Sequence, residues 1–75
     1  MVAYDYDRVK RALEAGAVDI LLLSRKLKKE THKELVALAE NISSKIEIVS
    51  HDTEEGQQFW NMTNGVGAIL RYRFE

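Results

Sequence analysis

Four consecutive aliphatic residues occupy positions 20–23, inside the segment VDILLLS at 18–24. An uninterrupted apolar run of this length, bounded by polar residues, is typical of a β-strand that is buried on both faces. We therefore expect 18–24 to form a strand in the centre of a sheet that is flanked by helices. In a chain of 75 residues, the remaining segments must supply the neighbouring strands and the helices that cover them.

The segment before this strand predicts a helix that begins near Asp5 and ends at Gly16. The Asp5 carboxylate can accept hydrogen bonds from the free amides of the first helical turn. Gly16 suits the left-handed conformation that commonly ends a helix. Apolar residues at helical spacing predict one buried face, formed by Val9, Ala12 and Leu13.

Two further helices are predicted after the strand. Thr31 and Glu34 stand at capping-box spacing at the start of the first, where each side chain can bond to a backbone amide. The second begins at Asp52 or Thr53 and runs to about Met62. Two glutamates in its first turn favour this start, because the helix dipole stabilises negative charge there.

Three more segments predict strands: KIEIVS at 45–50, AILRYR at 68–73 and a short edge strand, VAY, at 2–4. Helices and strands therefore alternate along the chain. This alternation predicts a single domain, 1–75, in which helices cover both faces of a small sheet, an α/β sandwich.

The composition limits the classes of function. The chain has no cysteine, and its two histidines, His32 and His51, stand apart, so we expect neither a disulfide framework nor a metal site. No apolar run approaches the ~20 residues of a membrane span, and we expect a cytoplasmic monomer. No nucleophile motif or catalytic carboxylate pair is present, so we expect a domain without enzymatic activity or cofactor.

The formal net charge is -1, so no overall field draws the chain to nucleic acid. Basic residues gather locally in SRKLKK at 24–29. We interpret this segment as a solvated loop and helix entrance, because no aromatic residue is interleaved for base stacking. Direct RNA binding is the second hypothesis, and low salt would be needed to see it.

The stretch NGVGAILRYR at 64–73 places two glycines before a strand. A phosphate-binding glycine turn follows a strand and opens a helix, whereas the order here is reversed. We therefore expect Asn64 and Gly65 to adopt positive φ and to end the third helix. Gly67 is expected to allow close backbone approach.

Trp60 directly follows Phe59, and adjacent residues on a helix do not share one face. Two interpretations of Trp60 stay open. The ring covers the rim of the core, or it is exposed and contacts a partner, since exposed aromatic residues are enriched at binding hot spots.

Three stretches carry a resemblance to a known family: VKRALEAGAVDILLLS at 9–24, IEIVSHDTEEGQQF at 46–59 and NGVGAILRYR at 64–73. They resemble the C-terminal domain of archaeal and eukaryotic class 1 peptide chain release factors (subunit 1) and the related domain of the ribosome-rescue factor Pelota. The resemblance implies a three-layer α/β/α sandwich with a small mixed sheet of three to four strands, like the kink-turn-binding ribosomal proteins.

The resemblance also implies a binding role without catalysis. Domains of this family act in translation termination by docking a translational GTPase of the elongation-factor-1-alpha type and an ABC-type ribosome-recycling ATPase, and they reach the ribosome as part of the full-length factor. The contact surface so implied is the end of the third helix and the following turn, with the edge strand. Its residues are Trp60, Thr63, Asn64, Val2 and Tyr4.

The parent protein is left open between two alternatives. Release factors carry a mini-domain between the first buried strand and the next helix, where this chain has only residues 25–35, and this difference favours Pelota. The segments EEGQQF and LRYR look more like release factors, which we place first.

Thr63 replaces an aromatic residue of eukaryotic members that helps to bind the GTPase. Arg71 and Arg73 are either contacts or solvated edge charges. A third hypothesis is a free-standing interaction domain unrelated to translation.

Overall fold

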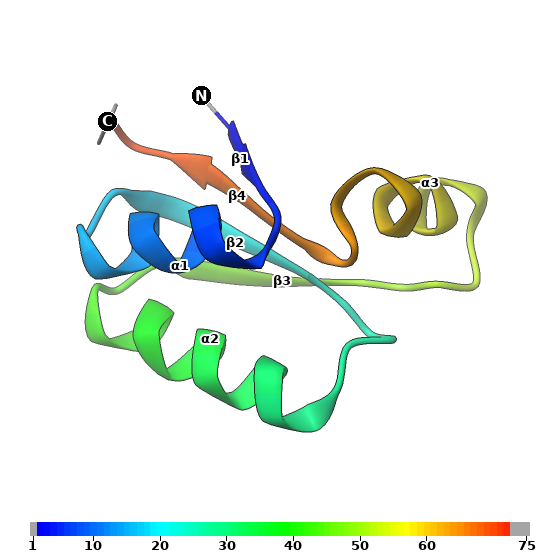
Figure 1. The fold of residues 1–75 in the computed structure, drawn as a ribbon, viewed down its shortest axis with the longest axis horizontal. Helices are drawn as coiled ribbons and strands as arrows, with labels where there is room; N and C mark the ends of the chain where they lie inside the picture. Colours follow the sequence, from blue (N-terminus) through cyan, green and yellow to red (C-terminus); the bar gives the residue numbers. More distant parts are fainter. Residues whose placement is uncertain (1, 73–75) are drawn as a thin grey trace.

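The computed structural model describes residues 2–72, which form three helices and four strands in alternation. Figure 1 shows the strands β1, β4, β2 and β3 following one another from top to bottom. The elements are β1 (Val2–Tyr4), α1 (Tyr6–Glu14), β2 (Val18–Ser24), α2 (Lys29–Asn41), β3 (Lys45–Val49), α3 (Glu54–Thr63) and β4 (Val66–Leu70).

The sheet is mixed, with the strand order β1-β4-β2-β3. β2 pairs in parallel with β3, while β4 runs antiparallel to both β1 and β2. The predicted edge strand at 2–4 is confirmed, and so is the interior position of 18–24. The last strand begins and ends earlier than predicted, at Val66–Leu70 rather than at 68–73.

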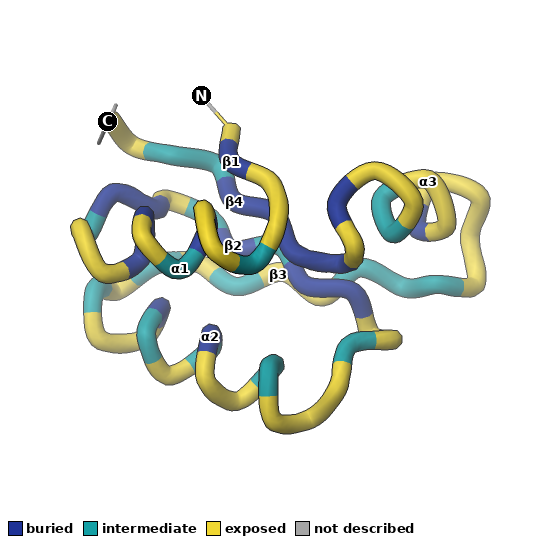
Figure 2. Tube along the Cα trace, viewed as in Figure 1, coloured by how far each residue is buried: buried dark blue, intermediate teal, exposed yellow. Residues whose placement is uncertain are grey.

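One face of the sheet packs against α1 and α2, and this interface is the hydrophobic core. The buried face of α1 consists of the three residues predicted from the sequence, and α2 contributes Leu35 and Ala39. The sheet contributes Leu21 and Leu23 from β2 and Ala68 from β4. Figure 2 shows buried residues gathered along β2 and β4.

The other face of the sheet is only partly covered. Side chains alternate between the two faces of a strand, so the neighbours of the core residues point away from α1 and α2. Gly67 is one of these, and the Phe59 ring of α3 lies against it. α3 has 10 residues and packs mainly on β2 and β4, so it covers only part of this face. Ile20 and Leu22 on this face are half-buried, so β2 is covered on both faces but less completely on the face of α3.

The predicted capping box of the second helix is also wrong. α2 begins at Lys29, with Lys28 as a cap residue whose side chain makes no capping hydrogen bond. Thr31 and Glu34 consequently lie inside the helix. The Glu34 carboxylate accepts a hydrogen bond from the Tyr6 hydroxyl of α1 instead. A contact between two helices has thus replaced the local contact that the sequence pattern suggested.

The other two helices begin at predicted cap residues. The Asp5 carboxylate accepts from the backbone amide of Arg8 at 3.2 Å, and the Thr53 hydroxyl accepts from the amide of Gly56 at 3.0 Å. α1 ends at Glu14, and Gly16 follows with a φ of 69°.

Candidate functional site

The turn between α3 and β4 is built by three consecutive residues. Thr63 is 2% exposed, and its hydroxyl donates to the Phe59 carbonyl at 2.7 Å and accepts from the Gly65 amide at 3.1 Å. Asn64 adopts the left-handed conformation, and its amide donates to the Trp60 carbonyl at 2.8 Å. Asn64 is exposed, whereas Thr63 is buried and its side chain shapes the turn.

Trp60 lies over this turn and is half-buried. A Cβ atom at Gly65 would lie 2.7 Å from a carbon of the Trp60 ring and 3.2 Å from a methyl carbon of Leu27. On the ring, the Lys26 ammonium lies 4.9 Å from the centroid, and the His51 ring makes an edge contact at 6.1 Å. The ring therefore packs on the turn and is also partly accessible, so both interpretations of Trp60 stay open.

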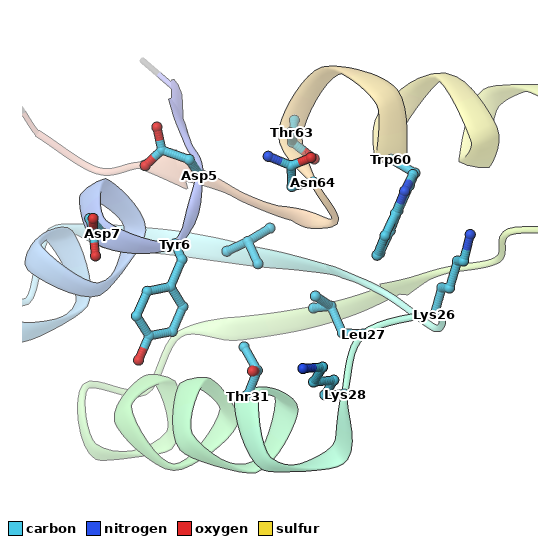
Figure 3. Close-up of a pocket in the computed structure, with 11 residues that line it drawn as sticks. Asp5, Tyr6, Asp7, Lys26, Leu27, Lys28, Thr31, Trp60, Thr63 and Asn64 are labelled. Atoms are coloured by element: carbon cyan, nitrogen blue, oxygen red, sulfur yellow. The ribbon is translucent and has the colours of Figure 1, made fainter.

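An open groove of about 640 Å³ lies beside Trp60, between the first turns of α1 and α2 and the end of α3. Figure 3 shows Asp5 and Asp7 on one side and Lys26 and Lys28 on the other. We name this the tryptophan groove. Its remaining lining residues are Tyr6, Leu27, Thr31, Trp60, Thr63, Asn64 and Val66. Carboxylates on one side, lysines on the other and an aromatic side chain beside them suit the binding of a protein segment.

The two residues predicted on the edge strand lie elsewhere. Val2 and Tyr4 are 54% and 44% exposed, and they flank the buried Ala3, so their side chains point to the open face of the sheet. Neither residue lines the tryptophan groove. The five predicted contact residues thus fall in two places. Trp60, Asn64 and the buried Thr63 line the tryptophan groove, whereas Val2 and Tyr4 lie on the exposed strand.

A cluster of three side chains links α1 to α2 near this groove. The Glu34 carboxylate accepts from the Tyr6 hydroxyl and lies 3.8 Å from the Lys10 ammonium. The hydrogen bond to Glu34 raises the pKa of Tyr6 above its ordinary value, and the negative charge of Glu34 raises the pKa of Lys10. The cluster is at the surface and makes no nucleophile available at neutral pH.

Arg71 makes contacts that the sequence did not reveal. Its Nε atom donates to the Val18 carbonyl at 3.0 Å, and its Nη2 atom donates to the Ile42 carbonyl at 3.1 Å. The side chain is exposed, and it joins the end of α2 to the start of β2. Arg73, the other arginine singled out from the sequence, lies outside the described residues.

Gly56 and Gly67 are constrained by packing and not by a positive φ. A Cβ atom at Gly56 would lie 1.6 Å from the Ser50 carbonyl oxygen, so α3 packs directly on this backbone. Nothing in the local sequence indicated that constraint. A Cβ atom at Gly67 would lie 3.1 Å from the Phe59 ring and 3.8 Å from the Ala3 carbonyl oxygen, so the absence of a side chain lets this ring approach β4 closely.

Within residues 2–72, no group of His, Asp and Glu side chains could hold a metal ion. No helix in this part of the chain is long and apolar enough to cross a membrane.

The fold and the groove define a small α/β domain with an open groove at its surface. The family model described as eRF1 domain 3 matches residues 1–74, and the chain belongs to this family. Among curated relatives, peptide chain release factor subunit 1 of Thermococcus onnurineus is 31% identical over all of this chain and 29% of its own length. The pelota homolog of Halobacterium salinarum is 36% identical over 97% of this chain and 23% of its own length.

The fold of a solved relative agrees with this assignment. The C-terminal domain of the release factor from Methanosarcina mazei matches with a TM-score of 0.90 and 26% identity, over 97% of this chain and 72% of that domain. The predicted fold class, a three-layer α/β arrangement on a small mixed sheet, is confirmed. The chain spans less than a third of the length of the curated relatives that it matches.

The two groups of relatives differ in how they align. The Thermococcus release factor aligns over 121 positions although this chain has 75 residues, a difference of 46 positions without a counterpart here. The Halobacterium pelota homolog aligns over only 84 positions. The matched region of the pelota homolog is therefore closer to this chain in length than the matched region of the release factor.

Proposed function

We propose that the chain is a protein-interaction domain of a translation factor, and that it docks a translational GTPase through the tryptophan groove. The observation that carries this proposal is the half-exposed Trp60, fixed between Gly65, Lys26 and His51 at the end of α3. An aromatic ring held in one orientation loses little conformational entropy when a partner covers it. Asn64 extends the same surface.

Relatives support the class of partner. Dom34 of S. cerevisiae, 25% identical with a TM-score of 0.85, is a translation termination-like factor that interacts with Hbs1. An archaeal Pelota, 29% identical with a TM-score of 0.85, is known in a ribosome-bound model with ABCE1. We transfer both partner classes to this chain, a GTPase of the elongation-factor-1-alpha type and an ABC-type recycling ATPase, together with cytoplasmic action at the ribosome.

The parent factor is proposed to be a release factor that acts at stop codons, because the segments EEGQQF and LRYR resemble that group. A second candidate is the rescue factor Pelota. The observation that favours it is the alignment over 84 positions, which lacks most of the additional positions seen with the release factor. In either parent, the domain contributes binding and no catalysis.

A heteronuclear NMR titration of the labelled chain tests the proposal, with an archaeal elongation-factor-1-alpha-type GTPase as the partner. We expect shift changes at residues 60–65 and in the facing loop at 25–28. Trp60→Ala should weaken binding by about tenfold, since truncation of an aromatic hot spot costs about 1.4 kcal/mol or more. The amide spectrum of the variant shows whether the fold is intact.

Tyr4→Ala serves as the matched control, because it removes an exposed aromatic residue outside the groove. Wild-type affinity in a correctly folded Trp60→Ala variant would overturn the proposed surface. Equal losses of affinity in the two variants would show that the GTPase contacts both the tryptophan groove and the exposed edge strand. Shift changes with a kink-turn RNA and none with the GTPase would support the RNA-binding hypothesis instead.

A further inference from the structure

A second groove lies on the other side of the loop at 25–29, between the first half of α2 and the edge strand β3. Its volume is about 450 Å³. It is lined by Arg25, Leu27, Lys29, His32, Lys33 and Ile48, and we name it the basic groove. Neighbouring lysines of the loop face the tryptophan groove instead, namely Lys26 and Lys28.

The charge of this groove has one sign. Arg25, Lys29 and Lys33 are exposed cations, and no carboxylate lines the groove. Within residues 2–72, none of the three has an ion-pair partner. The net charge of the whole chain is -1, so the positive potential is a local property of this groove. The tryptophan groove differs, because Asp5 and Asp7 offset its lysines.

The groove also contains apolar surface. Ile48 is 43% exposed, and the half-buried Leu27 also lines the groove. A free phosphate would use the cations and leave this surface in water. A single-stranded nucleic acid binds through base stacking on aromatic side chains, and the basic groove has no aromatic residue apart from the His32 ring.

The geometry of β3 favours an extended occupant. β3 is the last strand of the sheet, and no strand among the described residues pairs with its outer edge. An extended segment beside it can form backbone hydrogen bonds while its side chains reach alternate pockets. The first turn of α2 faces the same groove and adds a favourable dipole for negative charge.

We propose that the basic groove binds an extended acidic segment of a partner protein, with carboxylates on Arg25, Lys29 and Lys33 and an aliphatic side chain on Ile48 and Leu27. Apart from Leu27, which lines both grooves, this surface is built from residues that do not line the tryptophan groove. The inference therefore goes beyond the proposed GTPase docking and does not depend on it.

Fluorescence anisotropy with a labelled peptide of Glu and Leu, with Glu in excess, tests the proposal on the whole chain. The comparison peptide carries Gln in place of every Glu. We expect measurable binding of the acidic peptide and at least about tenfold weaker binding of the Gln peptide, since several ion pairs are lost together. Raising the salt concentration should weaken the binding of the acidic peptide, because the cations are exposed.

Two double variants with the same charge change identify the groove. Lys29→Glu with Lys33→Glu should weaken the binding of the acidic peptide by about tenfold, as attraction becomes repulsion at two sites. Lys26→Glu with Lys28→Glu is the matched control and should change the affinity by less than about threefold, because these side chains face the other groove. Equal losses in both double variants would overturn the proposal in favour of a diffuse charge effect.

The apolar part has its own test. Ile48→Ser should weaken the binding of the acidic peptide by about threefold or more, whereas Val2→Ser, at a similarly exposed strand position, should leave it unchanged. Tighter binding of a single-stranded RNA than of the peptide, lost in the Lys29→Glu and Lys33→Glu double variant, would overturn the proposal by identifying a nucleic-acid groove. Unchanged amide spectra confirm that each variant is folded.

Discussion

Gly65→Ala is the substitution that most directly tests how the tryptophan groove is built. Gly65 adopts a φ of 92°, a conformation that residues with side chains rarely tolerate. The added methyl group would also lie 2.7 Å and 2.9 Å from two carbons of the Trp60 ring. Two independent penalties therefore act at one position, one on the backbone and one on the ring.

The magnitude follows from these two penalties. A left-handed conformation costs a residue with a Cβ atom about 1–2 kcal/mol, and forcing a methyl group into a packed contact costs about 1–3 kcal/mol. Together they predict a loss of about 2–5 kcal/mol in the free energy of unfolding. For a domain of this size each kcal/mol lowers Tm by roughly 4–8 °C, so the variant should unfold well below the wild-type chain.

Urea denaturation followed by tryptophan fluorescence measures the loss, because Trp60 is the single tryptophan of the chain. The same substitution in a Trp60→Ala background, followed by circular dichroism, separates the two penalties. Without the ring, Gly65→Ala should cost only the backbone part, about 1–2 kcal/mol. An equal loss in both backgrounds would refute the idea that Trp60 packs on Gly65.

Three further substitutions test other contacts. Gly56→Ala would stabilise an isolated helix by about 1 kcal/mol. In this domain it should instead lower the free energy of unfolding, measured by urea denaturation, by about 3 kcal/mol, because the methyl group meets the Ser50 carbonyl oxygen. A stabilised variant would contradict this packing. Arg71→Met should cost about 1–3 kcal/mol in the same assay through two lost hydrogen bonds to backbone carbonyls, and no loss would show that these bonds do not form in solution. The hydrogen bond to Glu34 raises the pKa of Tyr6, so its stabilising effect is complete below about pH 10 and is lost as the pH rises further. Between about pH 8 and pH 11 the Tm of the wild-type chain should fall more than that of Tyr6→Phe, and parallel curves would exclude the linkage.

The sequence predicted the parts of the fold that depend on strong periodic patterns. The aliphatic run at 18–24 became β2 with its predicted bounds, and the buried face of α1 follows its helical spacing. Predictions that rest on one local contact were less secure. Glu34 was assigned to a capping box, but Tyr6 competes for the same carboxylate from a helix that is distant in sequence.

The candidate sites were harder to predict because they combine several elements. Trp60 was singled out from its position beside Phe59, yet its neighbours Lys26 and His51 come from two separate loops. The basic segment at 24–29 was treated as one solvated stretch, whereas alternate residues face different grooves. Periodicity along one element carries no information about such assemblies, since they depend on how loops meet in space.

The position of β4 has a consequence for how the chain folds while it is being synthesised. β4 comes last among the strands but lies between β1 and β2, and Val2 pairs with Ile69. Until 66–70 have left the ribosome, β1 has no strand beside it, and only the β2–α2–β3 unit can form its sheet contacts. Pairing between the ends of a chain is slow, because the loop must close before contacts form. Completion of the sheet therefore waits for β4, and the tryptophan groove, whose lining includes Val66 of that strand, is assembled only after β4 has inserted.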